Sequence, residues 1–118
     1  MAKILIVDDD PLFIALIEEL LSEDNRHSIL TENNGYHIPA ILEAEKPDLL
    51  ITDLVMPDRE GLEIVISTRE QYPDLPIIAV SGVAKDYLSM AKDMGANDVI
   101  EKPINPDSFL NMVNQYFS

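Results

Sequence analysis

Five side chains that can bind a cation or a phosphoryl group follow short apolar runs of the sequence, namely Asp8, Asp9, Asp53, Ser81 and Lys102. Three carboxylates brought together repel one another unless a cation joins them. A hard divalent ion suits such a cluster: Mg²⁺, or Mn²⁺ in its place, combines one or two protein carboxylates with water and phosphate oxygens. These residue types therefore predict a magnesium site that can also hold a phosphoryl group.

Asp53 is the best candidate for a nucleophile among the three acids. Asp8 and Asp9 form an adjacent pair suited to a metal and its surroundings, whereas Asp53 stands alone at the end of an apolar run. A carboxylate held among a metal, the Lys102 ammonium and the Ser81 hydroxyl can attack phosphorus and form an aspartyl phosphate. We therefore expect Asp53 to be the phosphoacceptor.

The elements that must position these side chains alternate along the whole chain. Apolar runs without alternation predict buried strands over 3–7, 48–52, 76–80 and 97–101, and a weaker run predicts an edge strand over 27–31. Helical periodicity predicts helices over 11–22, 36–45, 62–72, 84–94 and from 106 onwards. Helices between short strands imply parallel pairing, because parallel neighbours need a crossover connection. Ligands of open parallel sheets bind beyond the carboxyl ends of the strands. The five side chains should therefore meet at one rim.

Helix-end signals support this division of the chain. Asp10 and Asn105 each precede a proline, Pro11 or Pro106, which pairs a preferred N-cap residue with one suited to the first turn. Gly95 is a typical C-terminal stop. We expect Asp10 to cap a helix rather than to act as a third metal ligand of its segment.

Residues outside the rim carry weaker signals. A metal site needs partners that His27 and His37 lack, and we expect both at the surface. Methionine fills irregular gaps in cores, so we expect Met90, Met94 and Met112 to be core residues rather than a binding stripe.

Composition narrows the classes of partner. The 118 residues carry a net charge of −14, from 22 acidic and 8 basic residues. Nucleic-acid affinity depends on Lys and Arg, so cations or basic protein surfaces are the better partners. No apolar run approaches the ~20 residues of a membrane helix, and the start leaves no room for a signal peptide. The chain has no cysteine, which suits the cytoplasm. We expect a single domain over 1–118.

Several motifs together resemble the receiver domain of two-component response regulators, in order and at similar spacing. They are Val7-Asp8-Asp9-Asp10-Pro11, Asp53-Leu54-Val55-Met56-Pro57 with Gly61, Ser81-Gly82, and Gly95-Ala96-Asn97-Asp98 leading to Lys102-Pro103. The resemblance covers essentially the whole chain. It implies an α/β, flavodoxin-like (βα)5 fold, with a five-stranded parallel sheet of order 2-1-3-4-5 and helices on both faces.

The resemblance also implies roles for the rim residues. Asp53 would accept a phosphoryl group from a histidine kinase or a histidine phosphotransfer protein. Asp9 and Asp53 would bind Mg²⁺ directly with the backbone carbonyl of Val55, while Asp8 supports them.

Ser81 and Lys102 would contact the phosphoryl oxygens. The domain would assist its own phosphotransfer and dephosphorylation without being an enzyme in its own right. It would signal through altered protein–protein binding on the face formed by 84–94, 97–101 and the last helix.

Two alternatives remain open. Haloacid-dehalogenase-type phosphatases also use an Asp nucleophile at a strand tip, but with a second acid two positions later, where this chain has Val55. A degenerate receiver, acting as an interaction module that is never phosphorylated, is the other alternative. The complete set of site residues argues against it, namely Asp8, Asp9, Asp53, Ser81 and Lys102.

One position departs from the family pattern. Receivers commonly carry Tyr or Phe three residues before the lysine, where this chain has Val99. A β-branched aliphatic side chain cannot sample the rotamers of a switching aromatic ring. We expect a small rearrangement at the start of helix 84–94, with Tyr87 as a substitute. Apolar Val55 and Val83 beside the site predict slow self-dephosphorylation.

Overall fold

The structure is a computed structural model that describes residues 2–23, 27–54, 61–82 and 85–117. The strands are β1 (Ala2–Val7), β2 (His27–Glu32), β3 (Leu49–Asp53), β4 (Ile77–Ser81) and β5 (Asp98–Glu101). The helices are α1 (Pro11–Ser22), α2 (Ile38–Glu45), α3 (Gly61–Gln71), α4 (Lys85–Met94) and α5 (Pro106–Gln115). Strands and helices alternate along the chain, as the sequence predicts.

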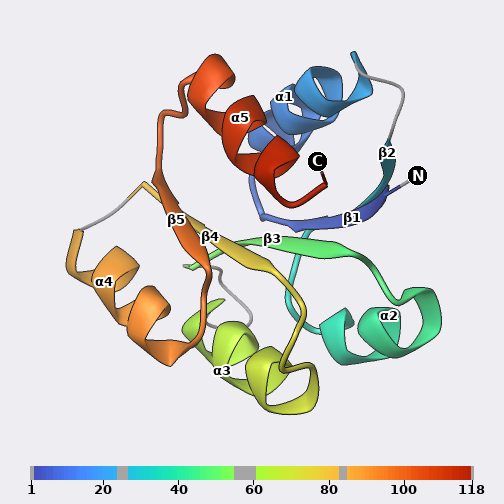
Figure 1. Cartoon of the computed structure of the whole chain (residues 1–118), viewed down its shortest axis with the longest axis vertical. Helices are drawn as coiled ribbons and strands as arrows, with labels where there is room; N and C mark the ends of the chain where they lie inside the picture. The colour runs from blue at the N-terminus through green and yellow to red at the C-terminus, as the bar shows by residue number, and fades with distance from the viewer. Residues whose placement is uncertain (1, 24–26, 55–60, 83–84, 118) are drawn as a thin grey trace.

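The strands form one parallel sheet of order β2-β1-β3-β4-β5. This confirms the predicted order and places β2 at an edge. In Figure 1, α1 and α5 cover one face of the sheet, and α2, α3 and α4 cover the other. The rim where the strands end is therefore held between two helical layers.

Alternate residues of the central strands feed two separate cores. Ile4 and Ile6 of β1 pack with α1 and α5, whereas Leu5 and Val7 pack with α2, α3 and α4. All five residues of β3 are buried. Burial on both faces explains why these strands read as continuous apolar runs.

Both predicted N-caps are confirmed. The Asp10 side chain accepts a hydrogen bond from the Leu12 N–H at 3.0 Å, and Asn105 accepts one from the Ser108 N–H at 3.0 Å. Gly95 follows α4 with φ of +128°, a conformation that side chains rarely adopt. Local sequence thus sets where these helices begin and end.

Three side chains do not lie where the sequence predicts them, namely Met90, Met94 and His27. Met90 and Met94 are 43% and 41% exposed, because Ala91 is the side chain through which this part of α4 reaches the core. His27 is half-buried, with its ring centroid 5.3 Å from that of Phe117. His37 is exposed, as expected.

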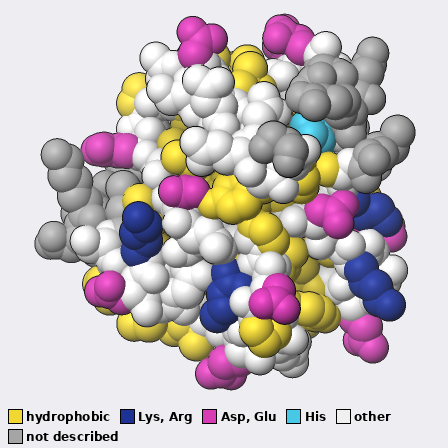
Figure 2. Space-filling view, in the orientation of Figure 1, with side chains coloured by type: hydrophobic (Ala, Val, Ile, Leu, Met, Phe, Trp, Pro, Cys, Tyr) yellow, Lys and Arg dark blue, Asp and Glu magenta, His cyan; other side chains and the backbone are white. Residues whose placement is uncertain are grey.

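Among the helices of the described ranges, none is both long enough and apolar enough to cross a membrane. On the face drawn in Figure 2, acidic side chains are scattered among other residues instead of forming one patch.

Candidate phosphoacceptor and metal site

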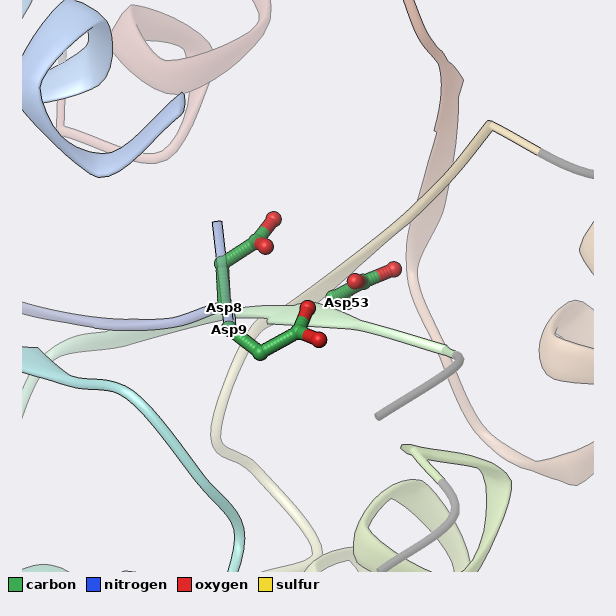
Figure 3. A group of neighbouring side chains, drawn as sticks. All are labelled: Asp8, Asp9 and Asp53. Carbon is green, nitrogen blue, oxygen red and sulfur yellow. The ribbon is translucent and has the colours of Figure 1, made fainter. Parts of the chain in front are cut away.

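The carboxyl ends of β1, β3, β4 and β5 bring the predicted residues to one rim. Asp8 follows β1, Asp53 ends β3, Ser81 ends β4 and Lys102 follows β5. Val7 is in register with Thr52, so Asp8 and Asp53 come side by side as their strands end. Figure 3 shows Asp8, Asp9 and Asp53 together at neighbouring strand ends.

Backbone hydrogen bonds continue the sheet just past the strand ends and hold the rim in place. The Leu54 N–H donates to the Val80 carbonyl at 2.9 Å, and the Lys102 N–H donates to the Ser81 carbonyl at 2.8 Å. The Asp8 N–H donates to the Glu32 carbonyl at 3.1 Å. These bonds fix the backbone at Asp8, directly after Asp53 and at Lys102.

Three carboxylates form a compact acidic cluster. Asp8, Asp9 and Asp53 each offer one oxygen, and these oxygens all lie within 4.8 Å of one another. Asp8 is fully buried and Asp53 is 6% exposed, whereas Asp9 is exposed. The cluster thus has a buried floor and an open side from which a ligand can enter.

Lys102 supplies positive charge to the buried floor. Its Nζ lies 2.9 Å from Asp8 Oδ2 and 3.8 Å from Asp53 Oδ2. The cluster has three carboxylates and this one ammonium lies beside two of them, so negative charge remains in excess. Repulsion of this kind favours a further cation.

The two oxygens of Asp8 have different surroundings. Oδ1 accepts a hydrogen bond from the Asp10 N–H at 2.9 Å, which joins the site to the first turn of α1. Oδ2 is buried and has no well-aligned hydrogen-bond donor within the described residues, although Lys102 lies close enough for an ion pair. A buried oxygen of this kind is suited to a cation.

This donor set fits Mg²⁺ or Mn²⁺. Hard divalent ions take carboxylate and carbonyl oxygens, and the cluster offers oxygen donors alone. Asp8, Asp9 and Asp53 would hold the ion. Val55, whose carbonyl the family resemblance adds to this set, lies outside the described residues.

Gly61 allows the backbone of β3 to reach this position. A Cβ at Gly61 would lie 2.1 Å from the carbonyl oxygen of Asp53 and 2.4 Å from Cα of Leu54. The Gly61 N–H also donates to the Leu54 carbonyl at 2.9 Å. The start of α3 thus approaches the acceptor strand more closely than any side chain permits.

Ser81 and Val99 are the remaining residues of the sequence prediction that the structure describes. Ser81 is fully buried at the end of β4, one position beyond Val80, the register partner of Asp53. Val99 is half-buried and packs against the core beneath α4. Val83 and the side chain of Tyr87 lie outside the described residues.

Sequence reasoning missed one neighbour of the site. Phe13 lies under Lys102, with Nζ 4.3 Å from the ring centroid. The contact joins segments far apart in sequence, and nothing in either segment signals it.

Comparison with known proteins points to a single family. The family model described as "Response regulator receiver domain" matches residues 4–114. Transcriptional regulatory protein KdpE of Staphylococcus aureus is 36% identical over 107 residues, which cover 90% of this chain and 46% of that protein. The chain thus spans about half the length of that relative.

Two further proteins match along most of their length. Protein PilH of Pseudomonas aeruginosa is 32% identical over 120 residues, covering 97% of this chain and 96% of that protein. The crystal structure of a response regulator signal receiver domain from Bermanella marisrubri matches with a TM-score of 0.89 at 32% identity, covering 98% of each chain.

Proposed function

This chain belongs to the response regulator receiver domain family, and we propose that it is a phosphoacceptor switch whose acceptor is Asp53. One observation carries the proposal. The Asp53 carboxylate, 6% exposed at a strand tip, lies in a compact acidic cluster with the Lys102 ammonium 3.8 Å away. We treat residues 1–118 as one receiver domain.

The transfer step follows from these groups. A carboxylate oxygen of Asp53 attacks the phosphorus of a phosphohistidine. The new P–O bond forms as the P–N bond breaks, and the electron pair leaves with the imidazole nitrogen. Lys102 and Ser81 stabilise the charge on the phosphoryl oxygens.

The acidic cluster would hold the divalent ion for this step through Asp8, Asp9 and Asp53, joined by the Val55 carbonyl. A bound Mg²⁺ neutralises charge on the phosphoryl oxygens and on the carboxylates around them. Phosphorylation replaces the single negative charge of the Asp53 carboxylate with the charge of a phosphoryl group, about −1.5 to −2, so an acidic rim becomes more acidic. Lys102 and the cation make that addition tolerable.

The donor in this proposal is a histidine kinase or a histidine phosphotransfer protein. Output is altered binding of another protein to the face of α4, β5 and α5. Met90 and Met94 are exposed on α4 and would offer apolar contact area to a protein bound to that helix. Because Val99 replaces an aromatic residue, we propose that the start of α4 transmits the signal. We also propose that Asp53 loses its phosphoryl group slowly, because Val55 and Val83, which flank the site in the sequence pattern, are apolar.

Beryllofluoride binding tests the proposal, since this group mimics a phosphoryl group on a carboxylate. We expect beryllofluoride to shift NMR signals at the ends of β3, β4 and β5 and at the start of α4. These shifts should appear only when Mg²⁺ is also present. Asp53→Asn should abolish them, whereas Asp107→Asn, at an exposed acid of α5, should not. Shifts that persist in Asp53→Asn would contradict Asp53 as the acceptor.

The main alternative is a degenerate receiver that binds partners without phosphorylation. The half-buried Val99 in place of a switching ring is the observation in its favour. That module would bind its partner equally well with and without beryllofluoride. A pull-down under the two conditions separates the alternatives.

A further inference from the structure

We propose that Phe13 is a positioning residue for this switch, and that its ring holds the Lys102 ammonium beside Asp8 and Asp53. The inference deepens the proposed function and rests on it, because it takes Lys102 as a group that contacts the phosphoryl oxygens. Phe13 itself touches no reacting atom in this account. It acts through the lysine.

The contacts place the ammonium between an aromatic ring and two acids. Lys102 Nζ is 4.3 Å from the Phe13 ring centroid, 2.9 Å from Asp8 Oδ2 and 3.8 Å from Asp53 Oδ2. A cation within about 6 Å of a ring centroid is attracted to the ring face. Phe13 is 8% exposed, so water does not weaken this contact as it would at an open surface.

The ring is itself held firmly. Phe13 packs in the core between α1 and the sheet with Ile17 and Leu21. The Asp10 side chain caps α1, and the Asp10 N–H donates to Asp8 Oδ1 at 2.9 Å. One short segment therefore fixes both the ring and the acid that share Lys102.

A lysine side chain depends on a neighbouring ring to fix its position more than an arginine side chain would. Its charge sits on a flexible stem with several rotatable bonds, and it makes no bidentate pair. An open hollow of about 430 Å³ lies beside it, lined in part by Phe13, Leu12, Gly82 and Lys102. Without the ring, the ammonium has room to turn away from the acids, and preorganised stabilisation of charge would be lost.

The first test needs neither metal nor phosphate. An aromatic ring shifts the NMR signals of protons held over its face. We expect the Lys102 ε-methylene protons to show this shift in wild type and in Phe13→Tyr, and to lose it in Phe13→Leu. Leucine keeps apolar volume in the core but removes the ring.

The second test measures the rate of phosphorylation by acetyl phosphate with Mg²⁺. We expect Phe13→Leu to lower the rate roughly two- to five-fold, the factor that a single cation–π contact supports. Phe13→Tyr should retain the wild-type rate. Val113→Ala, which thins the same core from α5, should also retain it and controls for a merely structural effect.

A double-mutant cycle with Lys102→Met links the two residues. In that background Phe13→Leu should cause no further loss of beryllofluoride affinity. Equal losses in both backgrounds would overturn the inference, as would equal phosphorylation rates for Phe13→Leu and Phe13→Tyr. A wild-type protein that accepts no phosphoryl group would instead overturn the proposed function, while the Lys102 shifts would report separately on the ring contact.

Discussion

Lys102 is the residue on which the electrostatics of the rim depends. It is the partner of a fully buried carboxylate, Asp8, and its side chain is 22% exposed. Removing one member of a buried ion pair leaves the other charged and poorly solvated, which costs more than the pair contributes in the first place. Lys102 therefore affects stability as well as phosphoryl transfer.

We expect Lys102→Met to lower the free energy of unfolding by about 2 kcal/mol in EDTA. This lies below the loss for a fully buried pair, because Lys102 is partly in water. Saturating Mg²⁺ should restore part of that stability, since a cation at the cluster replaces the missing charge. Urea denaturation with and without Mg²⁺ measures both effects.

Lys92→Met is the matched control for this variant, because Lys92 is exposed on α4. It should change the free energy of unfolding by less than about 0.5 kcal/mol. Equal losses for the two variants would refute the claim that Asp8 depends on Lys102.

Gly61 and Gly82 both lie near the site but tolerate a side chain differently. A Cβ at Gly61 would meet the Asp53 backbone at 2.1 Å. Among the described residues, a Cβ at Gly82 would meet only the Lys102 side chain, at 3.6 Å. The first approach requires the backbone to move. The second is an ordinary van der Waals contact.

We therefore expect Gly61→Ala to destabilise the fold by about 3 kcal/mol and Gly82→Ala to change it by less than about 1 kcal/mol. Gly61→Ala should also slow the phosphorylation of Asp53, because the carbonyl that must move belongs to the acceptor residue. Thermal and urea unfolding compare the variants. Equal stability of Gly61→Ala and Gly82→Ala would contradict a close backbone approach between the start of α3 and the end of β3.

Among the helices and strands, Arg69 ties the end of α3 to the connection between α4 and β5. Its guanidinium donates to the backbone carbonyls of Gly95, Tyr72 and Pro73, and to Asn97 Oδ1 at 2.8 Å. Asn97 Oδ1 also accepts from the Ile77 N–H at 2.9 Å. The Arg69 side chain thus joins the end of α3, the loop that follows α3 and the connection between α4 and β5.

Arg69→Met should lower the free energy of unfolding by about 2 kcal/mol, since charged hydrogen bonds are lost where water can replace only some of them. Glu70→Gln, at the exposed neighbouring position, is the control and should have little effect. Urea denaturation compares them. A loss for Arg69→Met no larger than for Glu70→Gln would show that the network does not stabilise this corner.

Tyr116 ties the end of α5 to β5 through a hydrogen bond from its hydroxyl to Asp98. Burial, followed by that hydrogen bond and the negative charge of Asp98, raises the pKa of the Tyr116 phenol above its ordinary value of 10.0. Above about pH 10 the unfolded chain would lose this proton before the folded chain. The contribution of Tyr116 to stability is therefore complete below pH 10 and falls as the pH rises beyond it.

We expect the free energy of unfolding of wild type to decrease more steeply above pH 10 than that of Tyr116→Phe. Asp98→Asn should also make this decrease less steep than in wild type, because it removes the negative charge that opposes ionisation of the Tyr116 phenol. Urea denaturation between pH 8 and pH 11 tests this. Parallel curves for wild type and Tyr116→Phe would contradict the account.

For the molecule as a whole, patterns within single segments predicted most of the architecture. Continuous apolar runs such as 49–52 marked buried strands, and Asp10 with Pro11 marked a helix start. The strand order followed from the family resemblance. The rim residues were predicted because parallel strands end at one edge, which is a property of topology and not of side-chain detail.

Side-chain environments that depend on distant segments were not predicted. Lys102 meets Phe13 and Asp8 only through the packing of α1 against the sheet. Helix α2 begins at Ile38 instead of residue 36, because Asn34 accepts a hydrogen bond from the Tyr36 N–H at 2.9 Å and forms a turn first. Methionine content could not reveal that Met90 faces outward.

Phosphorylation of Asp53 is the central claim, and intact-protein mass spectrometry after incubation with acetyl phosphate tests it most directly. With Mg²⁺, wild type and Asp107→Asn should each gain the mass of one phosphoryl group. Asp53→Asn should gain none, and neither should wild type in EDTA. Wild type that gains no mass in Mg²⁺, or Asp53→Asn that gains as much as wild type, would contradict the account.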